Sequence, residues 1–108
     1  MLRIIGIKLR ISGYEVIAVN DEHQALHIVE HNCPDIVLLD IMMPGTDGFD
    51  VLRKMKSLPY VPVIVLSARQ ENREKSLALG AKTFILKPFN IDQLVTEIKA
   101  VLDHNDER

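Results

Sequence analysis

The sequence predicts an α/β domain, a three-layer sandwich in which helices cover both faces of a parallel sheet. Three apolar runs, 36–39, 63–66 and 84–86, are short enough for strands and hydrophobic enough to be buried on both faces. Patterns typical of amphipathic helices lie between them. Strands and helices therefore alternate along the chain, as they do in βαβ units.

The first residues fit two structures. Over 5–12, apolar residues alternate with polar or small ones, which is typical of a strand. However, Leu2, Ile5 and Leu9 also have helical spacing, and Gly13 is well placed as a helix C-cap. The pattern leaves both structures open.

A strand and a helix are expected next. The branched and aromatic residues of 14–19 predict a strand, after which Asn20 or Asp21 caps a helix that ends before Pro34. The apolar positions of this helix are Ala25, Leu26 and Val29.

Two further helices are expected between the later apolar runs. Thr46 or Asp47 caps the first of them. The polar stretch 69–76 leads into the second, which Gly80 closes and whose polar face we expect to be solvated. The residues that the first helix buries are Phe49, Leu52 and Met55.

The last helix has the clearest pattern. Asn90 and Gln93 form a capping box at its start. Its apolar residues recur at i, i+3, i+4 and i+7, which is typical of a helix with one buried face. They are Ile91, Leu94, Val95, Ile98, Val101 and Leu102.

Composition limits the classes of function. The 108 residues fit one domain, and the formal net charge of −2, with both signs interspersed, argues against a direct nucleic-acid partner. The single cysteine, Cys33, excludes an internal disulfide and is expected to be a small buried residue. Apolar residues near the N-terminus alternate with basic ones, so we expect no signal peptide, no membrane partner and a cytoplasmic protein.

A different polar side chain follows each apolar run: Asp40, Ser67 and Lys87. Parallel strands end on one edge of a sheet, and sites form in the crevice beyond that edge, so the three should converge. A carboxylate beside a hydroxyl and a cation suits capture of a phosphoryl group, because the acid attacks while the other two contact the phosphoryl oxygens. The alternative is that each strand simply ends where it reaches water.

Short motifs spread over nearly the whole chain follow the pattern of one family. They are Gly13-Tyr-Glu-Val16, Pro34-Asp35-Ile-Val-Leu-Leu-Asp40, Met43-Pro44 with Asp47-Gly48, Pro62-Val-Ile-Val-Leu-Ser67-Ala68, Gly80-Ala81 and Lys87-Pro88-Phe89. Through them the chain resembles the receiver domains of two-component response regulators. The resemblance implies a five-stranded, flavodoxin-like parallel sheet of order 2-1-3-4-5, and a phosphorylated signalling domain rather than an enzyme.

The resemblance also implies roles for single residues. Asp40 would accept a phosphoryl group from a histidine kinase or a phosphotransfer protein, and Lys87 would contact that group. Ser67 would be the switch hydroxyl, and Phe84 the aromatic residue whose rotamer follows it. The Lys87–Pro88 bond would be cis. A homodimer through the fourth helix, the last strand and the last helix is a further implied arrangement.

One departure from the family concerns the first strand. Receivers begin with a central strand that ends in an acidic pair, and this pair holds Mg²⁺ together with the phosphoacceptor. No such pair precedes Asp21, and the first residues resemble the second half of the first helix. The sequence therefore predicts a receiver domain over 1–108 that is truncated at its N-terminus and has no output domain, or one in which 4–11 forms a substitute strand.

Without the acidic pair, only Asp40 and the backbone carbonyl of Met42 remain as Mg²⁺ ligands, so we expect weak metal binding. Two functions stay open. One is a phosphorylation-dependent switch. The other is a phosphorylation-independent interaction module, or an inactive truncated remnant.

Three histidines, His23, His27 and His31, lie four residues apart in one predicted helix. Such spacing fits a row of metal ligands, but it equally fits a solvated helix face. No other ligand is apparent near them, so we interpret them as a solvated face.

Overall fold

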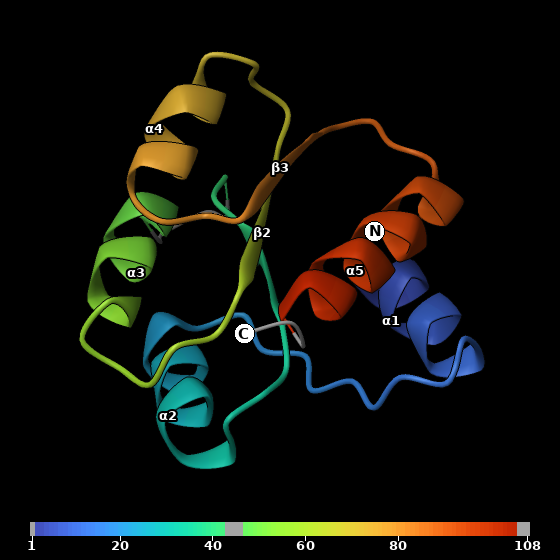
Figure 1. Cartoon of the computed structure of the whole chain (residues 1–108), viewed down its shortest axis with the longest axis horizontal. Coiled ribbons are helices and arrows are strands. Elements are labelled where there is room, and N and C mark those ends of the chain that lie inside the picture. The colour runs from blue at the N-terminus through green and yellow to red at the C-terminus, as the bar shows by residue number, and fades with distance from the viewer. Residues whose placement is uncertain (1, 43–46, 106–108) are drawn as a thin grey trace.

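The computed structural model describes residues 2–42 and 47–105 and arranges them in three layers, with the sheet in the middle (Figure 1). Two helices lie on one side of the sheet and three on the other. The elements are α1 (Leu2–Ile11), α2 (Glu22–Asn32), β1 (Val37–Asp40), α3 (Gly48–Met55), β2 (Val63–Ser67), α4 (Asn72–Ala78), β3 (Thr83–Leu86) and α5 (Ile91–Asn105).

The sheet is parallel and has the strand order β1-β2-β3. Asp40 pairs in register with Leu66, and Ser67 pairs with Leu86, so the three strands end close to one level. All five residues of β2 are buried, because it has a strand on each side and helices on both faces. The three apolar runs of the sequence are therefore strands, as predicted.

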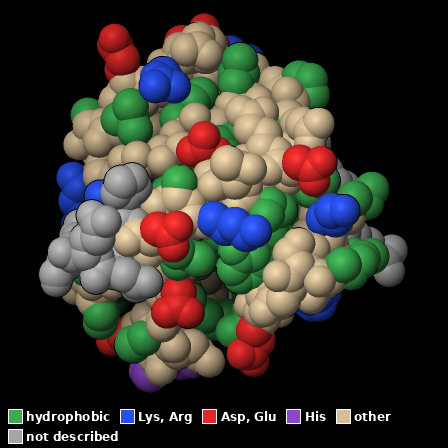
Figure 2. Space-filling view, turned by 45° about the vertical axis from the view of Figure 1, so that its right-hand side comes forward, with side chains coloured by type: hydrophobic (Ala, Val, Ile, Leu, Met, Phe, Trp, Pro, Cys, Tyr) green, Lys and Arg blue, Asp and Glu red, His purple; other side chains and the backbone are tan. Residues whose placement is uncertain are grey.

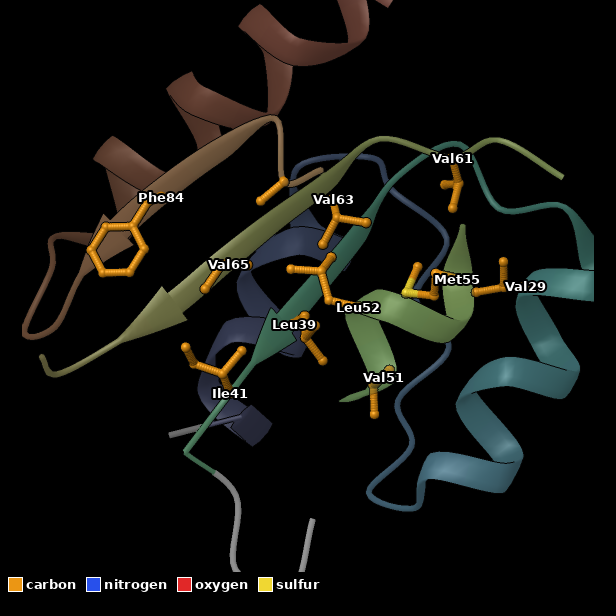
Figure 3. Close-up of a cluster of buried hydrophobic side chains, with 11 residues drawn as sticks. Val29, Leu39, Ile41, Val51, Leu52, Met55, Val61, Val63, Val65 and Phe84 are labelled. Carbon is orange, nitrogen blue, oxygen red and sulfur yellow. The ribbon is translucent and has the colours of Figure 1, made fainter. Parts of the chain in front are cut away.

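Side chains of β2 alternate between two hydrophobic cores. Val63 and Val65 point into the first core, beneath α2 and α3 (Figure 3), whereas Ile64 and Leu66 point into the second, beneath α1 and α5. The first core consists of Val29, Leu39, Ile41, Val51, Leu52, Met55, Val61, Val63, Val65, Ala81 and Phe84. The second consists of Ile5, Leu9, Ile64, Leu66, Ile85, Leu94, Ile98 and Val101.

The first residues form a helix, so the substitute strand over 4–11 was wrong. Ile5 and Leu9, one helical turn apart, are both buried in the second core. Gly13 has a φ of 98° at the end of α1, and the N–H of Tyr14 donates to the carbonyl of Leu9 at 3.0 Å. Helices commonly end at a left-handed glycine in this position, and the sequence predicted Gly13 in this role.

Residues 14–19 were expected to form a strand, and this was wrong. A strand needs a hydrogen-bonding partner along its length, and in the described part of the chain the sheet has only three strands, not five. The segment connects α1 to α2 without joining the sheet (Figure 1).

Three side chains cap helices where the sequence placed them. Asp21 accepts a hydrogen bond from the N–H of His23 at 3.1 Å, and Asp47 accepts one from the N–H of Phe49 at 3.0 Å. Asn90 accepts one from the N–H of Asp92 at 2.7 Å. The other candidate for the cap of α3, Thr46, lies outside the described residues.

Cys33 is exposed, which corrects the expectation that it is buried. It is the C-cap of α2 and has a φ of 47°, a left-handed conformation in which the helix ends. Its side chain consequently lies outside both cores.

The side chains of His23, His27 and His31 are exposed on α2, as a solvated face requires. The rings of the last two stack with their centroids 4.2 Å apart. In 2–42 and 47–105, no group of three His, Cys, Asp or Glu residues is placed to hold a metal ion. None of the helices there combines the length and the hydrophobicity needed to cross a membrane.

A surface ion-pair network links α2 to α3. The Lys54 Nζ lies 3.0 Å from an oxygen of Glu22 and 3.0 Å from one of Asp50. The hydrogen bond from Lys54 is the main cause that lowers the pKa of the Asp50 carboxyl below its usual value. The ionised Asp50 carboxylate, held by Lys54, therefore stabilises the folded chain at pH values above the usual carboxyl pKa. This stabilisation is lost as the pH falls through the lowered pKa of the folded chain.

We therefore expect the Lys54→Met variant to raise the pKa of Asp50 back toward its usual value. An NMR titration of the side-chain carboxyl carbon measures this directly. The Lys56→Met variant is the control, because it removes an exposed lysine of the same segment and should leave the pKa of Asp50 in place. An unchanged pKa of Asp50 in Lys54→Met would contradict the assignment.

Candidate functional site

Asp40 is the last residue of β1 and lies at the carboxyl edge of the sheet. Its Oδ2 forms an ion pair with the Nζ of Lys87, and its Oδ1 accepts a hydrogen bond from the N–H of Met42 at 3.0 Å. The side chains of Asp40 and Lys87 are 15% and 18% exposed. The acid is thus largely buried, and both of its oxygens have a partner.

Lys87 follows β3 directly and is held by its backbone as well as by its side chain. Its N–H donates to the carbonyl of Ser67 at 2.7 Å, which continues the pairing of β2 with β3 by one residue. The Lys87–Pro88 peptide bond is cis, as the family resemblance implied.

Ser67, at the end of β2, is fully buried and points toward α4. Its Oγ accepts hydrogen bonds from the N–H of Arg69 at 3.0 Å and from the Nδ2 of Asn72 at 3.1 Å. It also lies 3.5 Å from the carbonyl of Arg69, to which it can donate. The structure therefore brings Asp40 and Lys87 into contact and connects Ser67 to them through the backbone.

Asn72, the first residue of α4, is a part of the site that the sequence reasoning missed. Its Nδ2 bonds Ser67 and also lies 3.8 Å from the Sδ of Met42, so it links β2 to the segment after Asp40. It belongs to the polar stretch that we interpreted as solvated. The available signal was its position at a helix start, where an amide side chain can reach back to the preceding loop.

Phe84 is 7% exposed and pairs in register with Val65. Its ring lies in the first core, on the sheet face that carries α2 and α3 (Figure 3). Met42, by contrast, is 47% exposed at the end of the described segment that follows Asp40. Phe84 therefore belongs to the hydrophobic core, and its strand, β3, packs against α4.

Gly48 begins α3 and packs against the residue that follows Asp40. A Cβ built on Gly48 would lie 2.3 Å from the Cα of Ile41, far inside normal contact distance. In the sequence, Asp47 was a candidate helix cap and Gly48 was only a part of the family motif. In the structure, Gly48 permits close approach between α3 and the end of the strand that carries Asp40.

The described residues do not form a magnesium site. Mg²⁺ prefers an octahedral set of oxygen ligands, usually with more than one carboxylate or phosphate among them. The sequence left Asp40 and the carbonyl of Met42 as ligands. In the described part of the chain no group of three His, Cys, Asp or Glu residues is placed to hold a metal ion, and both oxygens of Asp40 already have partners. The donor set fits an ion pair with lysine better than it fits a metal.

The fold and the site together define a class of protein: α/β domains that hold an acid and a lysine at the carboxyl edge of a parallel sheet. Comparison with known proteins identifies the family. The model of the response regulator receiver domain matches residues 1–99, and the chain belongs to this family of two-component signalling domains.

Individual relatives agree with this assignment. The chain is 37% identical to the DNA-binding response regulator MtrA of Mycobacterium tuberculosis over 109 residues, which cover 99% of the chain and 48% of that protein. It thus spans about half the length of the curated relatives that it matches.

Solved structures show the same fold. A CheY-like receiver domain protein of Methanospirillum hungatei superposes with a TM-score of 0.89 and 30% identity, over 98% of this chain and 87% of that one. The Francisella response regulator 1452 receiver domain has a TM-score of 0.87 and 30% identity, over 95% of this chain and 88% of that one. The flavodoxin-like class predicted from the sequence is therefore confirmed.

Proposed function

We propose that Asp40 accepts a phosphoryl group from a histidine kinase or a phosphotransfer protein. The observation that carries the proposal is the ion pair between the largely buried Asp40 and Lys87 at the carboxyl edge of the sheet. Membership of the receiver family supplies the reaction class. Neighbouring groups in such a site only need to position the reactants and balance charge.

The transfer is a displacement at phosphorus. A carboxylate oxygen of Asp40 attacks, the bond between phosphorus and the imidazole nitrogen of the donor breaks, and that nitrogen keeps the electron pair and takes up a proton. Asp40 then carries an acyl phosphate. Lys87 balances the negative charge that the phosphoryl oxygens bring. The chain assists its own modification in this way without being an enzyme in the usual sense.

Ser67 and Phe84 would convert the modification into a change of surface. The hydroxyl of Ser67 now bonds Asn72 at the start of α4, so turning it toward a phosphoryl group on Asp40 exchanges one set of contacts for another. Phe84 lies on β3, which packs against the same helix. The surface formed by α4, β3 and α5 is the one we propose for a partner or for a second copy in a homodimer.

We further propose that residues 1–108 accept the group slowly and bind Mg²⁺ weakly, because among the described residues no group of three His, Cys, Asp or Glu residues is placed to hold a metal ion at Asp40. The same observation favours a second candidate function. If the acid is not modified at all, the chain serves as a phosphorylation-independent interaction module.

Labelling with a small phosphodonor tests the proposal. We expect acetyl phosphate with Mg²⁺ to add the mass of one phosphoryl group slowly, and borohydride reduction followed by peptide mass spectrometry to locate it at Asp40. The Asp40→Asn variant should remain unlabelled. The Asp35→Asn variant, which changes an exposed acid just before the same strand, should label like the unaltered chain.

Each outcome decides between the alternatives. Rapid, stoichiometric labelling would refute the proposed impairment, and a label on another residue would refute the role of Asp40. If no label forms after prolonged incubation, the proposed phosphorylation fails, and the interaction module and the inactive remnant are the functions that stay open.

A further inference from the structure

The outer face of α2 carries two histidines that are already in contact. His27 and His31 lie one helical turn apart, and both are exposed. Their rings stack with the centroids 4.2 Å apart and the planes inclined by 28°. Figure 2 shows histidine side chains at the lower edge of the molecule, the level at which α2 lies in Figure 1. The phosphorylation proposed for Asp40 does not involve this pair.

A hydrogen bond to the backbone orients the ring of His31. Its Nδ1 lies 3.0 Å from the carbonyl oxygen of His27, and a carbonyl can only accept, so Nδ1 is the nitrogen that carries the proton. In the neutral imidazole this leaves the lone pair of Nε2 free. Histidines that bind metals in proteins usually have this arrangement, in which one ring N–H donates to a carbonyl or carboxylate and the other nitrogen faces the ion.

The ring of His27 can supply a second nitrogen. Among the described residues, no hydrogen bond engages either of its ring nitrogens. Two histidines four residues apart on one helix face are a recurrent pair of zinc ligands. In a tetrahedral site with Zn–N bonds of about 2.0–2.1 Å, two such nitrogens lie about 3.3 Å apart. Rings that already stack at 4.2 Å need only small side-chain rotations to converge on one ion.

The charges on α2 favour a cation at this pair. His31 is in the last turn of the helix, where the negative end of the helix dipole stabilises positive charge. The helix contains no lysine or arginine, and its two acids are Glu22 and Glu30. Lys54 approaches the opposite end of α2, where it pairs with Glu22. An ion at the pair therefore meets no fixed positive charge from its own helix.

From these observations we infer that His27 and His31 bind one divalent transition-metal ion, with water in the remaining coordination positions. Imidazole suits Zn²⁺, Cu²⁺ and Ni²⁺, whereas Mg²⁺ prefers oxygen ligands. The site has only two protein ligands, which agrees with the absence of a three-residue metal group from the described residues. Because water completes the coordination, the histidine face stays solvated with the ion in place.

Titration of the full chain with Zn²⁺ tests this inference. Two-bond ¹H–¹⁵N NMR spectra of the histidine rings identify both the tautomer and the nitrogen that binds. Before zinc is added, His31 should be protonated at Nδ1. We expect the Nε2 signal of His31 and one ring nitrogen of His27 to shift together and to saturate at one ion per chain. Mg²⁺ at the same concentrations should leave both signals in place.

Variants of single histidines separate chelation from binding by one ring. His27→Gln and His31→Gln should each bind Zn²⁺ at least about tenfold more weakly, since even the loss of a residue that supports a ligand costs about 10–100-fold. His23→Gln is the matched control, because it removes an exposed histidine one turn earlier on α2 and should leave the affinity unchanged. Asp40→Asn should also bind Zn²⁺ like the unaltered chain.

Unchanged zinc affinity in His31→Gln would overturn the inference. A loss in His23→Gln as large as that in His31→Gln would overturn it too, because the pair would then be a different one. So would one Zn²⁺ per two chains with a dimer detected by light scattering, because a second copy would then take the place of water. None of these outcomes bears on the labelling of Asp40 by acetyl phosphate, so the proposed function stands or falls separately.

Discussion

Replacing Lys87 by methionine is expected to slow the labelling of Asp40 by acetyl phosphate roughly a hundredfold, the usual effect of removing one preorganised charge-stabilising group. Methionine keeps much of the length and the apolar stem but removes the ammonium that contacts Asp40. The rate of appearance of the phosphorylated species by intact-mass spectrometry measures the effect.

The same variant should also be less stable, because Asp40 is only 15% exposed and would lose its cation. We expect a loss of about 1–3 kcal/mol in the free energy of unfolding. The Lys82→Met variant, with an exposed lysine just before β3, should change neither the rate nor the stability. An unaltered labelling rate in Lys87→Met would show that Lys87 does not assist the phosphorylation of Asp40.

The Gly48→Ala variant is expected to lose about 2 kcal/mol or more of stability, within the range for overpacked positions. The added methyl would lie 2.3 Å from the Cα of Ile41, and backbone cannot move aside as a flexible side chain can. Urea unfolding followed by circular dichroism measures the loss. Because Ile41 follows Asp40, the variant should also slow the labelling of the acid.

Gly6→Ala is the control for this variant, and it should raise the free energy of unfolding instead of lowering it. Gly6 lies within α1, and a Cβ there would meet its nearest neighbour, the Nη1 of Arg10, at 3.6 Å, an ordinary contact. Alanine in place of glycine in a helix stabilises by about 0.5–1 kcal/mol. A Gly48→Ala variant as stable as the unaltered chain would show that α3 can shift away from β1 at low cost.

The strands and caps were predictable because each depends on local chemistry. The runs that became β1, β2 and β3 are apolar without interruption, and Asp21 and Asp47 occupy helix starts. Residues 14–19 have equally good strand propensity but no strand beside them. A strand depends on its neighbours, so propensity alone could not place this segment.

The site was predictable in its residue types and only partly in its contacts. The convergence of Asp40 and Lys87 follows from parallel topology, since strand ends share one edge. The side chain of Ser67 turns instead to Asn72, and Gly48 packs on Ile41. Both contacts join segments whose approach is set by tertiary packing, which periodicity does not record.

The strand order sets a requirement on the length of the cation. Asp40 ends β1 and Lys87 follows β3, and β2 lies between these two strands. The backbones of the two residues are therefore two strand spacings apart, about 9–10 Å at the usual distance between neighbouring strands. Only a long side chain can cross this span. A short cationic residue at position 87, such as diaminopropionate, would keep the charge and still leave Asp40 unpaired.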